Sequence, residues 1–388
     1  MVSYNEQRKR AVHERIGNGY DDILEMIAKY IDKEIVPGEK ERDEKKIFPR
    51  DKLEELANLG YISIPFPSKY GGSDLPFLVY TVFIEMLCEA SASLGITVAI
   101  HGTVCDGIEK FASNELKGKY LSDLIKGKKL AAFALTEPDS GSDAGSLKTS
   151  AVLKGDHYVL NGRKMFITNA GEADIYFVMA RTSKGISSFI VEKDFEGFEV
   201  GQLLEKMGIR ASKTGELIFN DCKVPKENLV GSEGKGLKYA LTMLNSGRIT
   251  VGAYSLGIAQ AAYEKSLRYS KERKQFGDYL ANYQLIREKL ANMSIKISAA
   301  RQLVYHAANL KDKGLNFEKE AAQAKLFASE EAVKICLDAI QIHGGMGYMV
   351  DTEVERLLRD AKMATIGEGA TEILLDKVIA PRCLKEVK

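Results

Sequence analysis

The first candidate for chemistry is an acidic side chain that stands between two glycines near the end of the chain. Glu368 follows Gly367 and precedes Gly369. Glycine neighbours give a carboxylate little steric cover, so Glu368 can project into a cleft and act as a general base. The alternative is that this acid marks the capped start of a helix. The other groups that proton transfer needs must come from other segments.

A loop rich in glycine, serine and threonine is the second candidate. It runs from Thr136 to Gly145 and directly follows a predicted strand. Such a loop offers backbone N–H groups and hydroxyls without side-chain bulk, so it can cradle a polar ring edge or a phosphate. A solvated surface turn has the same composition, and the loop alone leaves both interpretations open.

Three further segments combine polar groups with glycine or an aromatic ring. In 161–169, Phe166 and Thr168 share a face of a predicted strand, because side chains two residues apart point the same way. The basic segment 271–277 is predicted to end a helix at a glycine, and its charges suit a pyrophosphate. The segment 341–348 ends a predicted helix with three glycines, which permits close backbone approach. A core phenylalanine and ordinary helix caps are the structural alternatives.

Metal motifs and the usual nucleotide motifs are missing from the sequence. There is no glycine-rich fingerprint between a strand and a helix, there is no P-loop lysine motif, and the 5 histidines are scattered. We therefore expect no metal site. The 5 cysteines lie far apart and leave one over from any even set of disulfides, so we expect them to be reduced and structural.

Length and charge limit the class of protein. A chain of 388 residues is long enough for two or three domains, each with its own core. A hydrophobic share of 45% and a net charge of +1 argue against disorder and against general binding to nucleic acid or an anionic membrane. The polar N-terminus and the lack of a long apolar run predict a soluble, cytoplasmic protein without a membrane span.

Helical periodicity dominates both ends of the chain. Apolar residues recur at helical spacing in 21–35, 51–59 and 77–111, so the first third is predicted to be helical. The run 39–46 alternates charge sign and is interpreted as a solvated linker. Past residue 231, the sequence predicts a bundle of helices at 237–271, 280–311, 317–342 and 352–364.

Short β-rich runs occupy the middle of the chain. The dipeptides Gly155-Asp156 and Asn161-Gly162 between such runs are typical hairpin signals. The middle segment is therefore predicted to be an antiparallel sheet or barrel. Its expected strands lie at 131–135, 158–160, 165–168, 175–180, 188–191 and 217–219.

Taken in order, the five candidate segments resemble the acyl-CoA dehydrogenase family over essentially the whole chain. The stretches 66–72 (Phe-Pro-Ser-Lys-Tyr-Gly-Gly), 206–212 (Lys-Met-Gly-Ile-Arg-Ala-Ser) and 224–228 (Val-Pro-Lys-Glu-Asn) add to the resemblance. It implies an α+β, mostly α fold and a homotetramer built as a pair of dimers. The implied domains are an N-terminal all-α domain at 1–128, a middle antiparallel β-domain at 129–232 and a C-terminal four-helix bundle at 233–388.

The same resemblance implies FAD-dependent α,β-dehydrogenation of an acyl-CoA thioester. Glu368 would remove the α-proton while the flavin accepts the β-hydrogen as hydride, which gives the trans-2-enoyl-CoA. The negative charge on the thioester oxygen must be stabilised as it forms, by the backbone N–H of the base and by a flavin ribityl hydroxyl. Loss of water around the base raises its pKa toward the working pH. An electron-transferring flavoprotein is the implied electron acceptor.

The resemblance also assigns site residues. Glu368 and Arg248 are the expected catalytic residues. The residues expected to bind FAD are Leu135, Thr136, Ser142, Phe166, Thr168, Ala370 and Glu372, together with Arg273, Phe276, Gln284, Gln341 and Gly345, which would reach the FAD of a neighbouring subunit. The residues expected at the acyl-CoA are Ser142, Asn245, Gly247, Arg248, Gly367 and Gly369.

Three positions depart from the family pattern. Many members have Tyr at the position of Gly367 and Thr at that of Ala370, so one phosphate-facing hydroxyl is lost here. Some branches carry the base at the position of Gly247, which leaves Glu368 as the base in this chain. Because two glycines remove side-chain volume beside the reacting carbons, we expect room for a branched, cyclic or aryl acyl group.

Several polar residues near these segments have open roles. The stretch 91–109 contains no arginine, which argues against a dicarboxylyl substrate of the glutaryl type. His101 and Asp106 in this stretch are either structural or a polar pocket contact or second base. The motif residues Glu137, Asp143, Arg359 and Asp360 are compatible with structural ion pairs.

Two functional alternatives keep the same fold. One is a non-dehydrogenating relative that binds DNA or assists assembly, which should show a basic face and an altered base. The other is an acyl-CoA oxidase, which usually carries a long C-terminal extension. The near-neutral charge, the intact Glu368 and the short segment after residue 372 disfavour both.

Overall fold

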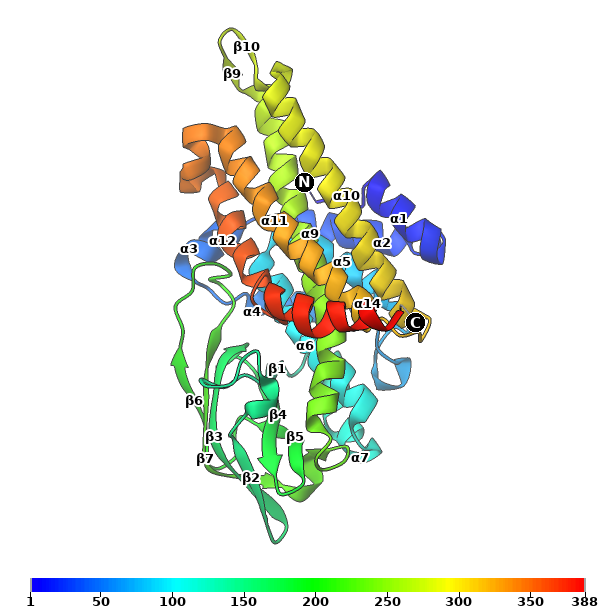
Figure 1. Ribbon diagram of the computed structural model, residues 1–388, viewed down its shortest axis with the longest axis vertical. Coiled ribbons are helices and arrows are strands. Elements are labelled where there is room, and N and C mark those ends of the chain that lie inside the picture. Colours follow the sequence, from blue (N-terminus) through cyan, green and yellow to red (C-terminus); the bar gives the residue numbers. More distant parts are fainter. Residues whose placement is uncertain (1, 387–388) are drawn as a thin grey trace.

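The computed structural model describes residues 2–386 as an elongated molecule, with helices filling most of its length and a twisted sheet at one end (Figure 1). The N-terminal part is helical. Its helices are α1 (Glu6–Ile16), α2 (Asp21–Tyr30) with its π-helical continuation (Ile31–Ile35), α3 (Glu39–Lys45), α4 (Arg50–Asn58), α5 (Phe77–Ala90), α6 (Ala92–Phe111), α7 (Asn114–Leu116) and α8 (Ser122–Ile125). The two long helices, α5 and α6, are largely buried.

The predicted helical stretch 77–111 is two helices, because the chain breaks at Ser91. Ser91 has extended backbone angles, and its side chain accepts a hydrogen bond from the backbone N–H of Leu94, as a helix N-cap does. Every residue of α5 is buried, which explains why its sequence is mostly apolar, and its two acids, Glu85 and Glu89, are paired with the buried Arg8.

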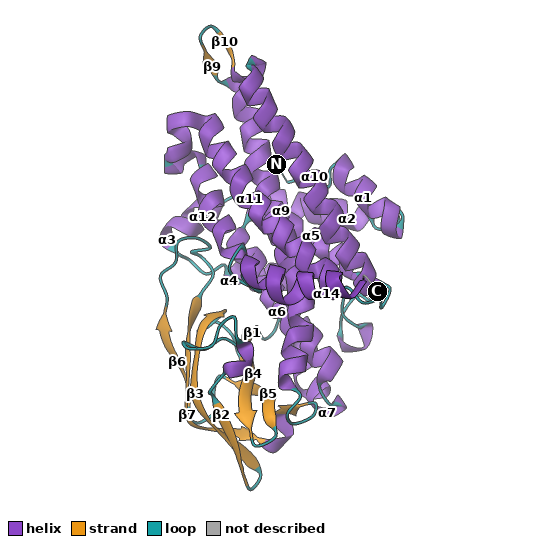
Figure 2. Cartoon of the chain, in the orientation of Figure 1, coloured by secondary structure: helices purple, strands orange, loops and turns teal. Residues whose placement is uncertain are grey.

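The middle of the chain forms an eight-stranded sheet in the order β6-β7-β3-β2-β4-β5-β8, with β1 joined to β4 (Figure 2). Most neighbours are antiparallel, as predicted, but β1 and β2 each pair with β4 in parallel. The strands are β1 (Ala131–Ala134), β2 (Ser150–Lys154), β3 (His157–Thr168), β4 (Ile175–Thr182), β5 (Gly185–Glu192), β6 (Phe198–Leu203), β7 (Thr214–Pro225) and β8 (Leu229–Val230).

One of the two hairpin predictions is wrong. Gly155-Asp156 joins β2 to β3 as expected, whereas Asn161-Gly162 lies inside β3, where the register with β7 shifts at a bulge. A Cβ on Gly162 would lie 2.6 Å from Oγ1 of Thr149. This glycine therefore permits close approach of a neighbouring strand and does not form a turn.

The C-terminal part is the predicted helical bundle, so the fold class is confirmed. Its core helix α9 (Gly236–Glu272) packs against α5, α10 (Gln284–Asp312), α11 (Glu318–His343) and α12 (Val354–Ala364). Close packing of α9 on α5 depends on Gly257, where a Cβ would lie 2.2 Å from the carbonyl oxygen of Glu85. The chain ends in α13 (Thr371–Ile373), a π-helical turn (Leu374–Ile379) and α14 (Ala380–Glu386).

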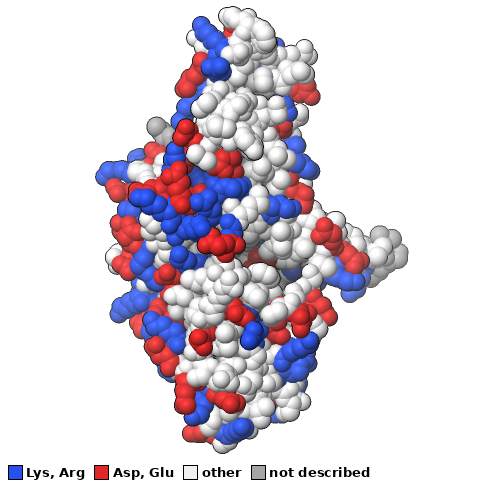
Figure 3. Space-filling model, turned by 90° about the vertical axis from the view of Figure 1, so that its left-hand side faces the viewer, with Lys and Arg blue, Asp and Glu red and all other residues white. Residues whose placement is uncertain are grey.

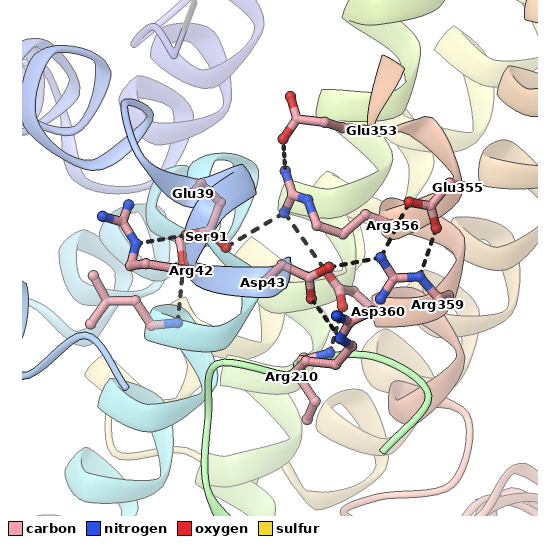
Figure 4. Close-up of polar contacts among 12 residues, drawn as sticks. Glu39, Arg42, Asp43, Ser91, Arg210, Glu353, Glu355, Arg356, Arg359 and Asp360 are labelled. Carbon is pink, nitrogen blue, oxygen red and sulfur yellow. Dashed lines mark hydrogen bonds and ion pairs between the residues drawn. The ribbon is translucent and has the colours of Figure 1, made fainter. Parts of the chain in front are cut away.

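The expected solvated linker at 39–46 is wrong, because this run is helix α3 and two of its acids are buried. Glu39 lies 3.5 Å from Arg356, and Asp43 lies 2.8 Å from Arg359. Both arginines belong to α12, so the alternating charges fix α3 to the bundle (Figure 4). Periodicity missed this helix because its buried face is charged.

The same network reaches the loop before β7. Asp360 of α12 accepts a 2.5 Å hydrogen bond from the backbone N–H of Ile209, and Arg210 lies 3.8 Å from Asp43 (Figure 4). Burial raises the pKa of Asp360 to about 6, although Arg356 lowers it. Arg359 and Asp360 thus form structural ion pairs, as the sequence suggested.

The proposed domain boundaries at 128 and 232 stay a prediction, although they fall between α8 and β1 and between β8 and α9. Within residues 2–386, the structure contains no helix that is both long and apolar enough to cross a membrane.

Candidate active site

Glu368 lies in the loop that joins α12 to α13, and its backbone takes an uncommon conformation. Its φ of 54° is left-handed, and Gly369 follows with a φ of 103°. The backbone N–H of Gly367 still bonds to the carbonyl of Met363 at 2.9 Å, so the turn starts from the helix end. Left-handed backbone costs about 1 kcal/mol or more for a residue with a Cβ, and it is common at functional sites.

The Glu368 carboxylate lies against the backbone of α9 at Gly247. A Cβ built on Gly247 would be 2.7 Å from Oε2 and 3.1 Å from Cδ of Glu368. Oε2 itself is buried and has no hydrogen-bond partner among residues 2–386. Gly247 therefore makes room for the acid, and the acid presents an oxygen that nothing in this part of the chain uses.

Burial sets the protonation of this acid. It raises the pKa of the Glu368 carboxyl from 4.5 to about 7, although the positive charges of Arg248 and Lys325 lower it. A carboxyl with a pKa near neutrality can take up and release a proton at physiological pH.

Two cations hold the backbone around Glu368. Arg248, on α9, is buried, its Nη1 donates to Oδ1 of Asn245 at 2.7 Å, and its Nε lies 3.4 Å from the carbonyl oxygen of Glu368. Lys325, on α11, is fully buried and donates to the carbonyl oxygen of Gly369 at 2.6 Å. The structure thus brings the predicted residues Asn245, Arg248, Gly247 and Glu368 together.

Lys325 was missed by sequence reasoning. The available signal was a lysine on the alanine-rich buried stripe of α11, where Ala321, Ala324, Ala328 and Ala332 are also buried. A charged residue on a buried stripe needs a partner, so it indicates a specific contact.

The residues predicted for one flavin edge gather where β1 ends beside β3. The backbone N–H of Met165 donates to the carbonyl of Thr136 at 2.9 Å, which joins the two segments. Phe166 has a φ of 61° and is 65% exposed, so its ring is presented to solvent. Leu135 is buried, whereas Thr168 is only partly buried and Ser142 is exposed.

Glu137, in the same loop, is structural. Its Oε1 lies 2.8 Å from Nζ of the fully buried Lys164, and its two carboxylate oxygens accept from the backbone N–H groups of Lys148 and Thr149. Asp143 contributes its carbonyl oxygen to the hydroxyls of Ser140 and Ser146, so the loop is shaped by its own hydrogen bonds.

A second group of predicted cofactor residues lies far from the sheet. Phe276 and Gly277 form the tip of the β9–β10 hairpin (Lys274–Gln275 and Asp278–Tyr279), at the opposite end of the molecule (Figure 1). The prediction that Gly277 caps a helix is therefore wrong, because α9 already ends at Glu272. Residues of this group are all exposed: Arg273, Phe276, Gln284, Gln341 and Gly345. Phe276 is 96% exposed, which is unusual for a large apolar side chain.

Ala370 and Glu372 flank the start of α13 next to the Glu368 loop. Glu372 is exposed, and the backbone N–H of Thr371 between them bonds to the carbonyl of Thr365 at 3.2 Å.

His101 has a structural role. Its Nε2 lies 3.0 Å from the carbonyl oxygen of Leu124, and its Nδ1 lies 3.1 Å from the backbone N of Ala131, so both ring nitrogens are used. Burial lowers the pKa of His101 to about 4, so the ring is neutral at pH 7. This arrangement excludes His101 as a second base.

Asp106 forms an ion pair near the candidate site. It lies 3.0 Å from Nζ of Lys311 and accepts from the hydroxyl of Ser246 at 2.9 Å. Burial acts to raise its pKa, but Lys311 and the hydrogen bonds lower the pKa overall. Asp106 is thus held ionised next to the residue that precedes Gly247.

The two glycines that suggested a large acyl pocket are covered by the chain itself. The volume at Gly247 holds the Glu368 carboxylate, and a Cβ on Gly367 would lie 3.0 Å from Sδ of Met363. Glu368 and Met363 therefore lie directly beside these two positions, and the expected room for a bulky acyl group stays a prediction.

Comparison with known proteins gives matches along the whole chain. Residues 19–128, 132–222 and 234–382 match the family models described as acyl-CoA dehydrogenase N-terminal domain, middle domain and C-terminal domain. A short-chain specific acyl-CoA dehydrogenase of Clostridium acetobutylicum is 43% identical over 90% of this chain and 94% of its own length. A 3-(aryl)acrylate reductase of Clostridium sporogenes is 41% identical over 94% of this chain and 98% of its own length.

One solved structure is similar over almost its full length. It is described as the electron transferring flavoprotein of Acidaminococcus fermentans, in work on flavin-based electron bifurcation. The match has a TM-score of 0.92 and 44% identity, and it covers 94% of this chain and 97% of the other.

Proposed function

The chain belongs to the acyl-CoA dehydrogenase family, and on that premise we propose that Glu368 is the base that removes the α-proton of an acyl-CoA thioester. Membership makes the protein an oxidoreductase that dehydrogenates acyl-CoA with FAD. The observation that carries the role of Glu368 is its buried Oε2, which has no hydrogen-bond partner among residues 2–386. An unused buried carboxylate oxygen is costly unless a ligand supplies its partner.

The residues present fit a flavin. Phe166 offers an exposed ring on a strained backbone, which suits stacking against another aromatic system, and the partly buried Thr136 and Thr168 lie in the two segments that the Met165–Thr136 hydrogen bond joins. The exposed Phe276 and Arg273 on the far hairpin suit contact with the cofactor of a second copy. When bound, the flavin supplies the acceptor for the β-hydrogen as hydride.

The chain's own residues hold the base and set its pKa. Gly247 lets the Glu368 carboxylate lie against α9, and Arg248 and Asn245 form a hydrogen-bonded pair beside its backbone. Burial brings the pKa of Glu368 to about 7, and exclusion of water by a bound thioester raises it further. The backbone N–H of Glu368 is the proposed donor to the thioester carbonyl, where negative charge grows in the transition state.

We propose a short, unbranched acyl group as the substrate. One similar enzyme is named short-chain specific, and the Glu368 carboxylate and the Met363 sulfur lie directly beside Gly247 and Gly367. A bulky aryl group is the second candidate, supported by similarity to a 3-(aryl)acrylate reductase.

Further assignments follow the resemblance. An electron-transferring flavoprotein is the proposed electron acceptor, as the family resemblance implies, and a similar chain occurs in a solved structure whose description names such a flavoprotein. A second copy is proposed because the cofactor residues fall into two groups at opposite ends of the molecule, which a dimer would bring together (Figure 1), and the homotetramer, as a pair of such dimers, follows from the resemblance. The cytoplasmic location stays a prediction.

The DNA-binding and assembly alternative is not favoured. The face shown in Figure 3 mixes acidic and basic side chains, and the net charge is +1. A surface that binds nucleic acid usually shows an excess of basic side chains.

An anaerobic titration tests the proposed function. The FAD-loaded protein is mixed with straight C4 to C8 acyl-CoAs and with branched and aryl ones, and the flavin absorbance is followed. We expect bleaching by the shorter straight thioesters and its loss in Glu368→Gln, which should still bind the CoA ester. Substantial bleaching by E368Q would move the base elsewhere, and no bleaching by any thioester would contradict the dehydrogenase reaction.

A further inference from the structure

Lys325 is a charged side chain in a place where a charge is expensive. It is 0% exposed, and it lies on α11 among buried alanines. An ammonium group removed from water costs several kcal/mol unless it is hydrogen-bonded or paired. Its partner is the carbonyl oxygen of Gly369 at 2.6 Å, one residue past Glu368.

The Lys325 contact completes a clamp on the Glu368 loop. Arg248 on α9 lies 3.4 Å from the carbonyl of Glu368, and Lys325 on α11 binds the next carbonyl more closely. Both residues of the loop have positive φ, at 54° and 103°. A loop in this conformation needs fixed partners to keep it, and the two helices provide one each.

The charges around the base come from four elements. Arg248 and Lys325 are the two cations whose charges act on Glu368. Further charged side chains act on these two cations, so the electrostatic potential at Glu368 depends on them as well. The further groups are Glu330 on α11 and Glu372 on α13, which act on Lys325, and Glu318 on α11 and Arg382 on α14, which act on Arg248.

We propose that Lys325 is a positioning residue for the reaction: it anchors the Glu368 loop through the Gly369 carbonyl, and its ammonium charge favours the ionised form of the base. The inference rests on the proposed role of Glu368. Burial lowers the pKa of Lys325 to about 8, although Glu368 raises it, so the ammonium is charged at pH 7. Removing this charge must then raise the pKa of Glu368 and leave less carboxylate at neutral pH.

The test is a titration of Glu368 in Lys325→Met and Lys325→Arg. The carboxyl stretch of protonated Glu368 is followed by infrared spectroscopy in the substrate-free protein, with E368Q subtracted, and the rate of anaerobic flavin bleaching is measured over the same pH range. In K325M we expect the midpoint of the Glu368 titration to rise by about one pH unit. This is the low end of the range of pKa shifts that loss of a nearby opposite charge produces. At low acyl-CoA concentration, where the rate reports the substrate-free protein, bleaching should slow about fivefold at pH 7 and recover toward pH 9. K325R keeps the charge and should keep the midpoint.

Lys265→Met is the matched control, because Lys265 is a partly buried lysine 3.2 Å from Glu353 and lies in the bundle away from the base. It should leave the midpoint unchanged. A wild-type midpoint in K325M would overturn the inference. If K325M does not fold, as judged by thermal unfolding, Lys325→Gln takes its place and the same criterion applies. A wild-type protein that never bleaches would refute the proposed function, whereas the infrared titration would still decide the role of Lys325.

Discussion

Replacing Gly247 with alanine would place a methyl group against the Glu368 carboxylate. The new Cβ would lie 2.7 Å from Oε2, whereas ordinary contact begins near 3.4 Å, so the carboxylate must move by roughly 0.7 Å. A displacement of about 1 Å at a reacting group can cost about 100-fold in rate. We therefore expect flavin reduction in Gly247→Ala to slow by about 10- to 100-fold.

The same substitution should not weaken the fold. Alanine is favoured over glycine inside a helix by about 1 kcal/mol, and the atom that must give way is the end of a flexible side chain. Stopped-flow bleaching and thermal unfolding are measured together, with Gly252→Ala as control. A Cβ at Gly252 would meet Cγ2 of Val304 at 2.9 Å, so the control should lose stability before it loses rate. A G247A enzyme that bleaches within twofold of wild type would refute the placement of Glu368 against α9.

Two further predictions concern pH and a buried ion pair. Because burial raises the pKa of Glu368 to about 7 in the substrate-free protein, the second-order rate of bleaching at low acyl-CoA concentration should rise with pH to a plateau, with its midpoint near 7; a midpoint near 4.5 would show that the base is solvated. Lys164→Met leaves Glu137 buried without its cation, which should lower the free energy of unfolding by about 3–5 kcal/mol in urea at pH 7. Its control is Lys148→Met, whose exposed pair with Asp139 should contribute less than about 1 kcal/mol; equal effects would contradict this reasoning.

Helical and strand periodicity predicted most elements, and two of its failures have a clear physical cause. It missed helix α3 because Glu39 and Asp43 are buried against arginines of α12 that lie more than 300 residues away. It interpreted Asn161-Gly162 as a hairpin, although Gly162 serves close approach to Thr149. The first error arises because a distant part of the chain overrides a local preference, and the second because β3 continues past Gly162, which packs closely against Thr149.

The sequence by itself determined the family and the order of the segments and singled out Glu368 as the candidate base, because these depend on residue types at fixed spacing. Only the tertiary structure decided what surrounds that acid. It placed Gly247 under the carboxylate, left Oε2 buried without a partner in residues 2–386, and brought Lys325 from α11 to the Gly369 carbonyl. The pKa of an acid depends on burial and on charges brought near it by folding. Lys325 and Gly369 lie more than 40 positions apart in the sequence, and Arg248 and Glu368 more than 100, so no local sequence pattern contains these contacts.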